Sequence, residues 1–525
     1  MATTKASVEV RETIDSNIDF PVCPTPNHKW LNWLVLVNLI IIGLAEGLWG
    51  YDGALISPLI SLPHFVAKYQ GPGFDGAYVF SARNLDLLVA LPICGGAIGA
   101  FGATPLQRRI GRKRSLLLAY AILCIPGSVL QLFAPNMAAF VFGRFWNYLG
   151  MGILTNITTI YQSDLVPAHV RARAVGFTVA GFAASALLAT VVVWAAEKID
   201  DHRQYVIPLA IQAAVPALLF VLTLFVPESP IWLISKGRID EARAVLTSLR
   251  AENMTMVEAE ITAALDALKT EQDERATRSV WDILKPPHLE RTLSSGALYC
   301  TSQSSGQILI STYSTVSLIQ AGVADPFKIT VIIYMAQLIG TIIGPPLVDK
   351  IGRRPVALYC FIILFLLDIA LGGIACAGLT TNAQSLALAS LCIIFFFVDA
   401  LSFQSLCYLA PTEIPTAALR EPAQSWSLIW AYSTAVISSF AAPQITSPNA
   451  GNLGAKAFLI FAGFMLLTII WTYFYYPETA NRTLAEIDEL YASKLPKRKW
   501  KNYKTAGPRV VAPEAPEKNA NQSEC

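Results

Sequence analysis

The stretch Lys350-Ile351-Gly352-Arg353-Arg354 decides the fold, because a matching stretch, Arg109-Ile110-Gly111-Arg112-Lys113, occurs earlier in the chain. Two further passages are duplicated in the same order: Asp164-Leu165-Val166-Pro167 matches Glu413-Ile414-Pro415, and Pro227-Glu228-Ser229 matches Pro477-Glu478-Thr479. Each copy follows a long apolar segment. All three pairs are separated by about 245 residues, which predicts two halves of one duplicated unit.

The composition indicates an integral membrane protein. Of the 525 residues, 54% are hydrophobic and only 14% are charged. A helix that spans the hydrocarbon core needs roughly 20 apolar residues. Twelve segments qualify, at residues 31–57, 79–103, 115–134, 138–162, 174–196, 206–226, 293–320, 327–348, 355–378, 384–410, 423–445 and 455–476. We therefore expect an all-α integral membrane protein with twelve transmembrane helices in two pseudo-symmetric six-helix halves.

The spans and the polar stretches between them predict five regions. These are an N-terminal tail (1–30), a first half (31–227), a linker with short amphipathic helices (228–291), a second half (292–477) and a C-terminal tail (478–525). Basic residues collect in every second loop, so the positive-inside rule puts both tails and the linker in the cytoplasm. The basic end of the C-terminal tail is expected to be solvated.

Several classes of function are disfavoured. The net charge of +2 gives no sign of nucleic-acid binding, and the nine cysteines show no CxxC pair or metal-ligand spacing. The chain also shows no nucleophile–base pair and no phosphate-binding loop. We expect neither an enzyme nor a bound cofactor.

The duplicated passages resemble the signatures of the sugar-porter branch of the major facilitator superfamily, over about residues 31–491. The resemblance is carried by Pro227-Glu-Ser-Pro230 with Trp232-Leu233, Gly352-Arg-Arg354, Pro477-Glu-Thr479 with Arg482-Thr483, and Glu486-Ile487-Asp488. Within that branch, Tyr313-Ser-Thr315, Cys407-Tyr408 and Lys236-Gly-Arg-Ile-Asp-Glu241 are similar to the fungal α-glucoside–proton symporters. The resemblance implies the major facilitator fold and transport by alternating access.

Charged residues of the duplicated loops are expected to act as latches, in which basic side chains pair with carboxylates and with helix ends. The second half supplies Asp349, Arg353, Arg354, Glu413, Arg420 and Glu478, and the first half supplies Arg112, Asp164, Arg171 and Glu228. Arg108 stands in the first half where the family pattern has an acid, the counterpart of Asp349. We expect the missing carboxylate to weaken the first latch by roughly 1.5–3 kcal/mol.

Ionisable residues inside predicted spans are candidates for function, because a charge at a helix centre costs about 2.5–3.5 kcal/mol. Asp52 matches the segment-1 acid of proton-coupled sugar porters, and Arg144 matches the segment-4 arginine with which that acid pairs. The resemblance implies that protonation of Asp52 is linked to the state of the carrier. The alternative is a permanent structural ion pair in a porter that runs without protons.

Two further acidic residues, Glu46 and Asp368, also lie within predicted spans. Glu46 lies six residues before Asp52 and so on another face of the helix. It either packs or gates, or it is a second titrating group. Asp368 belongs to a segment that is peripheral in this fold, so we expect it to make a structural bond between helices.

The residues expected to bind substrate are Gln303, Tyr313, Asp399, Gln404 and Tyr408. Amide and hydroxyl groups suit sugar hydroxyls, and aromatic faces suit sugar rings. Asp399 either meets the ligand or hydrogen-bonds to a neighbouring helix. The chain departs from the family pattern at Val179, Ile308 and Tyr408, where glutamine, asparagine and tryptophan are usual.

The sequence thus predicts a membrane transporter of the sugar-porter type that imports a polyhydroxylated solute together with a proton. A non-sugar solute, imported or exported, is the main alternative because the polar recognition set is depleted. A non-transporting nutrient sensor is the other alternative. We expect a monomer in the lipid bilayer of the plasma membrane, with a small molecule and protons as its partners.

Overall fold

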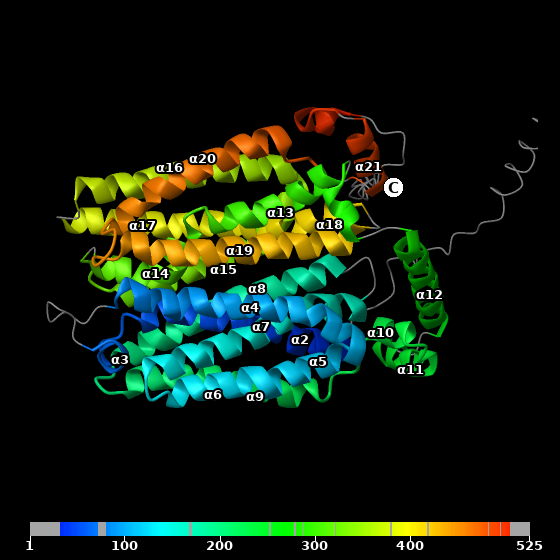
Figure 1. Cartoon of the computed structure of the whole chain (residues 1–525), viewed down its shortest axis with the longest axis horizontal. Helices are drawn as coiled ribbons and strands as arrows, with labels where there is room; N and C mark the ends of the chain where they lie inside the picture. The colour runs from blue at the N-terminus through cyan, green and yellow to red at the C-terminus, as the bar shows by residue number, and fades with distance from the viewer. Residues whose placement is uncertain are drawn as a thin grey trace, which may run out of the picture.

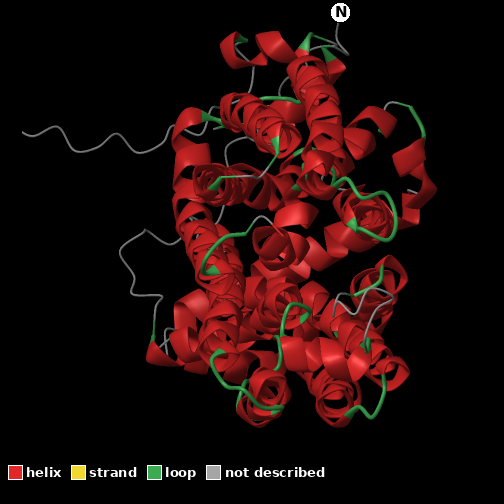
Figure 2. Ribbon diagram, turned by 90° about the vertical axis from the view of Figure 1, so that its left-hand side faces the viewer, coloured by secondary structure: helices red, strands yellow, loops and turns green. Residues whose placement is uncertain are grey.

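The computed structural model describes residues 32–71, 80–166, 171–250, 254–277, 280–286, 288–320, 322–378, 381–416, 419–480, 482, 484–493 and 495–503. Within these ranges the chain folds into helices and connecting loops, without a strand (Figure 2). The predicted N-terminal tail and the chain beyond Tyr503 lie outside the described residues.

The first half contains six spans. They are α2 (Trp33–Leu59), α4 (Ala82–Ile110), the continuous run α5–η1–α6 (Arg112–Leu118, Ala119–Cys124 and Ile125–Phe133), α7 (Met137–Leu165), α8 (Arg171–Glu197) and α9 (Arg203–Thr223). A short helix, α3 (Pro63–Tyr69), follows α2. Ser81 and Asn136 cap α4 and α7 by accepting bonds from Asn84 and Ala139 backbone N–H groups, which fixes where these helices begin.

The second half repeats this plan. Its spans are α13 with α14 (Leu289–Gln303 and Gln307–Gln320), α15 (Pro326–Ile351), α16 (Arg353–Ala377), α17–η4–α18 (Asn382–Asp399, Ala400–Gln404 and Ser405–Glu413), α19 (Arg420–Thr446), and η6 with α20 (Gly454–Ala457 and Phe458–Tyr475). The α13–α14 span is broken at Gly306, whose φ of +89° is a left-handed conformation that favours glycine.

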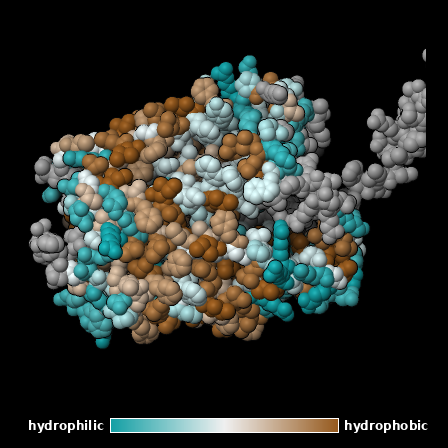
Figure 3. Space-filling view, viewed as in Figure 1, coloured by the Kyte–Doolittle hydropathy of each residue, from teal (hydrophilic) through white to brown (hydrophobic). Residues whose placement is uncertain are grey.

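The helices match the twelve predicted spans. In the described part, nine helical runs are long and apolar enough to cross a membrane. The other three predicted spans coincide with α7, the α13–α14 pair and α19. Apolar side chains cover the middle of the visible face, and polar ones gather towards its two ends (Figure 3). The predicted fold class is confirmed.

The two halves lie side by side as separate helix bundles (Figure 1). They meet through α4 against α19, α8 against α15, and α2 against α14. The first two pairings are equivalent, because α15 is the counterpart of α4 and α19 is the counterpart of α8. Swapping the two halves turns one pairing into the other. The interface therefore follows the same two-fold pseudo-symmetry as the sequence repeat.

The linker forms helices at one end of the bundle, which we call the linker end (Figure 1). These are α10 (Pro230–Ser235), α11 (Ile239–Leu249), α12 (Met254–Thr277) and the short η3 (Val280–Leu284). Leu246, Val257 and Ile261 belong to one apolar cluster that joins α10, α11 and α12. Helical spacing of apolar residues in the sequence thus corresponds to a small packed unit.

The beginning of the C-terminal tail is docked at the linker end, as α21 (Leu484–Ala492) and η7 (Lys497–Asn502). Trp500 is fully buried and packs edge-on against Tyr491, with ring centroids 4.9 Å apart. Lys497 pairs with Glu290 at 3.0 Å. Our expectation of a solvated basic segment is wrong as far as Tyr503, because Trp500 is buried within the folded tail and Lys497 joins the tail to Glu290 of α13.

Candidate functional site

Asp52 and Arg144 form a buried ion pair in the first half. Arg144 Nη1 lies 2.7 Å from Asp52 Oδ1, and the two side chains are 1% and 0% exposed. Asp52 comes from the middle of α2 and Arg144 from α7, so the pair joins two helices. Buried charges are tolerated when they are paired and hydrogen-bonded.

Two amides complete the shell around the carboxylate. Asn147 donates to Asp52 Oδ2 at 2.9 Å, and Gln212 of α9 donates to the same oxygen. The Gln212 amide also donates to Gln131 Oε1 at 3.3 Å. Three helical spans, α2, α7 and α9, therefore meet at this carboxylate, and α6 is joined to them through Gln131.

Aromatic rings connect this pair with the second half. Arg144 Nη2 donates to the Tyr148 hydroxyl at 3.3 Å, and its guanidinium lies 5.2 Å from the centroid of that ring. Trp49 packs against Tyr148 at 5.1 Å and against Tyr432 of α19 at 6.3 Å. The contacts thus run from the ion pair across the boundary between the halves.

Glu46 is also buried and lies on the boundary side of α2. Its neighbours include Thr155 of α7 and Tyr432 of α19. Among the described residues, no hydrogen bond or ion pair joins Glu46 to Asp52 or Arg144.

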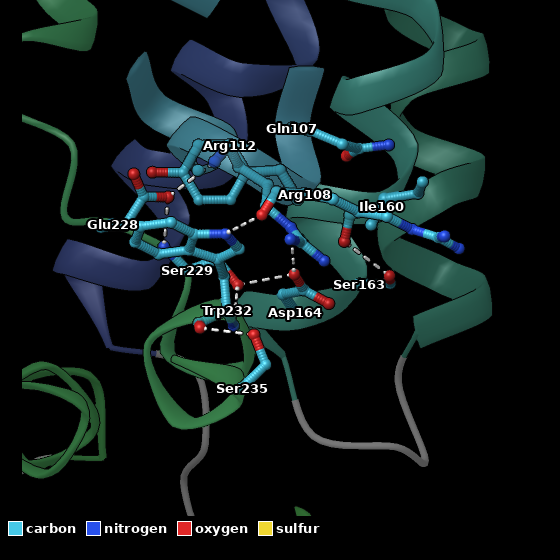
Figure 4. A network of polar contacts seen from close by, with 12 residues as sticks. Gln107, Arg108, Arg112, Ile160, Ser163, Asp164, Glu228, Ser229, Trp232 and Ser235 are labelled. Atoms are coloured by element: carbon cyan, nitrogen blue, oxygen red, sulfur yellow. Dashed lines mark hydrogen bonds and ion pairs between the residues drawn. The ribbon is translucent and has the colours of Figure 1, made fainter. Parts of the chain in front are cut away.

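The predicted latch of the first half is a network within that half (Figure 4). Glu228 Oε1 accepts bonds from the backbone N–H groups of Arg112 and Lys113, at 2.9 and 3.1 Å, where α5 begins. Arg112 Nε donates to Asp164 Oδ2 at 3.2 Å, and Ser229 donates to the same oxygen at 2.6 Å. A carboxylate at a helix N-terminus is stabilised by the unsatisfied N–H groups and the dipole.

The second half contains the same network. Glu478 accepts bonds from the backbone N–H groups of Arg353 and Arg354 at 3.0 and 3.2 Å, where α16 begins. Arg353 Nη2 lies 3.0 Å from Glu413 Oε1, and Thr479 donates to Glu413. Each network joins helices of one half, so we describe the two as the first and the second clamp.

Asp349 adds one further contact to the second clamp, at 3.0 Å from Arg353 Nη2. The Asp349 side chain is 69% exposed and that of Arg353 is 11% exposed, so water screens this contact from the side of the carboxylate. The expected loss of roughly 1.5–3 kcal/mol from Arg108 in the first clamp stays a prediction. The side chains of Arg171 and Arg420, also predicted to take part, lie outside the described residues.

The residues predicted to bind substrate are dispersed through the second half. Gln303 is half-buried near the α13–α14 break, and Gln404 Oε1 accepts a bond from Thr341 at 2.7 Å. Tyr313 is buried, without a hydrogen-bond partner for its hydroxyl among the described residues. Asp399 is fully buried and accepts a bond from Ser305 at 3.5 Å. The Tyr408 side chain lies outside the described residues.

A family described as "Sugar (and other) transporter" matches residues 37–491, which is most of the chain. The chain belongs to this sugar transporter family. It is 30% identical over 476 residues to a probable glucose transporter of Neurospora crassa, covering 86% of this chain and 79% of that protein. It is 26% identical to a general alpha-glucoside permease of Saccharomyces cerevisiae, covering 89% and 76%. The predicted family is confirmed.

A solved structure shares the fold of this sugar transporter. The xylose transporter XylE from E. coli, in a partially occluded inward open conformation, superposes with a TM-score of 0.71 at 19% identity, over 86% of this chain and all of that one. The protein is accordingly a multi-pass membrane transporter with the major facilitator fold, as predicted.

Several polar partners in this sugar transporter escaped the sequence analysis. Asn147, Gln212 and Gln131 contact one another or Asp52, yet none is part of a motif that we used. They are amides in apolar spans, where an unsatisfied polar group is costly. A search for uncharged amides inside the spans would have found them, although not their common target.

Proposed function

We propose that the protein imports a sugar or a related polyhydroxylated solute together with a proton. The supporting observation is the Asp52–Arg144 pair, which is fully buried, spans two helices and is connected by aromatic contacts to the second half. Protonation of Asp52 would cancel the charge that Arg144 meets. The pair therefore offers two charge states that different arrangements of the halves can favour.

Trp49 provides the physical connection in this mechanism. It lies between Tyr148, which contacts Arg144, and Tyr432 of the opposite half. A relative movement of the halves would displace Tyr432, then Trp49, and so alter the surroundings of the guanidinium. Each clamp meanwhile holds its own half as one body during this movement.

We also propose the orientation and setting of the transporter. The basic loops between spans lie at the linker end, which by the positive-inside rule faces the cytoplasm together with both termini. We place the protein in the plasma membrane as a monomer. The residues offered for substrate contact are Gln303, Tyr313, Asp399, Gln404 and Tyr408, and the relatives described as glucose and alpha-glucoside carriers favour a sugar.

Transport into proteoliposomes tests the coupling. For one proton per solute, one unit of pH difference supports up to about tenfold accumulation of labelled glucose or maltose, because each unit is worth about 1.4 kcal/mol. A protonophore should reduce this to equilibration. Asp52→Asn should equilibrate but not accumulate, while solute counterflow persists.

Asp201→Asn makes the same charge change at an exposed position between α8 and α9, and should accumulate like the wild type. Full accumulation by Asp52→Asn, or accumulation that is insensitive to the protonophore, would contradict proton coupling. Stabilisation of the purified protein by sugars in a thermal-shift screen would support the substrate class. Stabilisation by organic acids or aromatic metabolites alone would favour the non-sugar alternative.

A further inference from the structure

Two buried carboxyl groups lie close together in the second half of the transporter, apart from the Asp52–Arg144 ion pair of the first half. Asp368 is on α16 and Asp399 is at the end of α17, and neither side chain is exposed. These two helices pack against each other, and the adjacent residues Ser305 and Gly306 lie against Asp399 and Asp368, so the two carboxyl groups are neighbours. No element of the proposed coupling mechanism uses Asp368.

The two carboxyl groups lack the partners that a pair of buried charges needs. Both oxygens of Asp368 and the Oδ2 of Asp399 are buried without a hydrogen-bond partner among the described residues. Neither group forms an ion pair with a described lysine, arginine or histidine. We had expected a bond between helices for Asp368, and the described contacts do not provide one.

The surroundings of the pair are mainly apolar. The space beside Asp368 Oδ1 is shared with Phe458 and Phe461 of α20. The broken span contributes the Ser305 hydroxyl, 3.5 Å from Asp399 Oδ1. These neighbours supply one weak donor and no positive charge.

Two neighbouring carboxylates in such a place cannot both be ionised. Burial of one unpaired charge is already so costly that the group neutralises instead, and a second like charge nearby adds repulsion. Protonation of one carboxyl group removes its charge and turns one of its oxygens into a hydrogen-bond donor, which lowers the cost of burying the pair. The chemistry of the pair therefore fits a proton as its ligand.

The break between α13 and α14 touches both acids. A β-carbon placed on Gly306 would lie 3.1 Å from Asp368 Oδ1, and the adjacent Ser305 bonds Asp399. Gly306 has a φ of +89°, so this is where the span can bend. Movement of the break would change the solvation of both carboxyl groups together.

We propose that Asp368 and Asp399 form a second proton-binding site in the sugar transporter, which holds at least one proton when the α13–α14 break is packed against it. The site is independent of Asp52, and it shares Asp399 with the residues proposed for substrate contact. Proton binding here does not require proton coupling at Asp52, so either proposal can fail while the other stands.

Infrared spectroscopy of the full-length protein in lipid tests the site. At neutral pH the wild type should show the carbonyl stretch of a protonated carboxylic acid, shifted in deuterated water. The band should persist in Asp52→Asn and Asp201→Asn, and should lose intensity in the double variant Asp368→Asn/Asp399→Asn. The wild-type spectrum alone keeps the proposal testable if the double variant does not fold.

A wild type without this band at neutral pH would overturn the proposal, because both groups would then be ionised. A band of unchanged intensity in the folded double variant would assign the proton elsewhere. Loss of the band on adding sodium or potassium at constant pH would identify a metal-cation site and contradict the proton site.

The connection to the break has its own matched pair of variants. Gly306→Ala introduces strain at a positive φ and a methyl group against Asp368, and should shift the band or the pH at which it titrates. Gly322→Ala introduces similar strain at a φ of +70° with nothing within 4 Å of the added carbon, and should leave the band unchanged. Equal spectra for the two variants would separate the acids from the break and overturn that part of the proposal.

Discussion

Gly111 and Gly352 occupy equivalent positions in the two clamps, between the helices that each clamp joins. Their φ values are +99° and +110°, and a β-carbon on Gly352 would lie 2.8 Å from Glu478 Oε2. Any other residue would strain the backbone and displace the carboxylate that caps α16. The glycines of the duplicated motif are thus explained by the capping carboxylate.

Gly352→Ala should lower the stability of the transporter. The left-handed conformation costs roughly 1–2 kcal/mol for a residue with a β-carbon, and weaker bonds to Glu478 add to this. We expect the Tm in detergent to fall by roughly 2–5 °C. Gly102→Ala is the control, because this glycine lies inside α4 with nothing within 4 Å, and its Tm should not fall. Equal Tm values for both variants would contradict the capping argument.

The sequence predicted the contact between Asp52 and Arg144 but not the amide side chains that surround it. A charge in an apolar span is rare enough to attract attention, and a family pattern supplied its partner. Gln212 is one of many uncharged polar residues in the spans, and only the packing of α9 against α2 brings it to Asp52. The exposure of the Asp349 side chain could not be predicted either, because a sequence motif indicates which residues are neighbours and not how far each is exposed to water.

The docked tail shows how a single aromatic residue can place an element. Trp500 is buried beside Tyr491, and Arg482 donates to the Trp500 carbonyl oxygen at 2.5 Å. No apolar periodicity accompanies this tryptophan, and basic residues surround it in the sequence. The sequence pattern therefore favours a solvated segment. The twelve spans were predicted correctly because each is a long run of apolar residues.

Trp500→Ala should release η7 from the second half. Removing a buried tryptophan costs about 3–5 kcal/mol. The remaining Lys497–Glu290 pair is partly screened by water, because its carboxylate is 54% exposed. Hydrogen exchange of the peptide covering residues 484–503 should become faster, with little change in the spans. Trp281→Ala removes a tryptophan that is 69% exposed, and hydrogen exchange of residues 484–503 should stay slow in this variant. Unchanged exchange in Trp500→Ala would show that other contacts hold the tail.

Across the whole molecule, hydrogen bonds join the halves at the end opposite the linker. Ser57 meets Ser314 at 3.3 Å, and Gln444 donates to Asp86 at 2.6 Å. The Asn449 side chain accepts a bond from the backbone of Ala82 at 3.3 Å. These contacts lie between α2 and α14 and between the ends of α4 and α19, and they close this side of the boundary.

Gln444→Ala should favour conformations that open at this end. The bond to Asp86 is partly exposed and worth on the order of 1 kcal/mol, equivalent to roughly a fivefold change in population. Hydrogen exchange at the start of α4 should accelerate by about that factor. Ser390→Ala removes an exposed bond within α17 alone and should leave exchange in α4 unchanged. The same rate in both variants would mean that this contact does not hold the halves together.

The linker itself is divided between the halves. Trp232 and Arg250 attach α10–α12 to the first half through carbonyl oxygens of Arg108 and Leu165, while Thr292 attaches η3 to the second half through Ile283. The chain therefore passes between the two attachments from Thr277 at the end of α12 to Val280 at the start of η3, and three Cα–Cα steps reach at most roughly 10 Å. While α12 and η3 stay docked, this short connection limits how far the two halves can separate at the linker end. Its length therefore limits the size of the conformational change that transport can use.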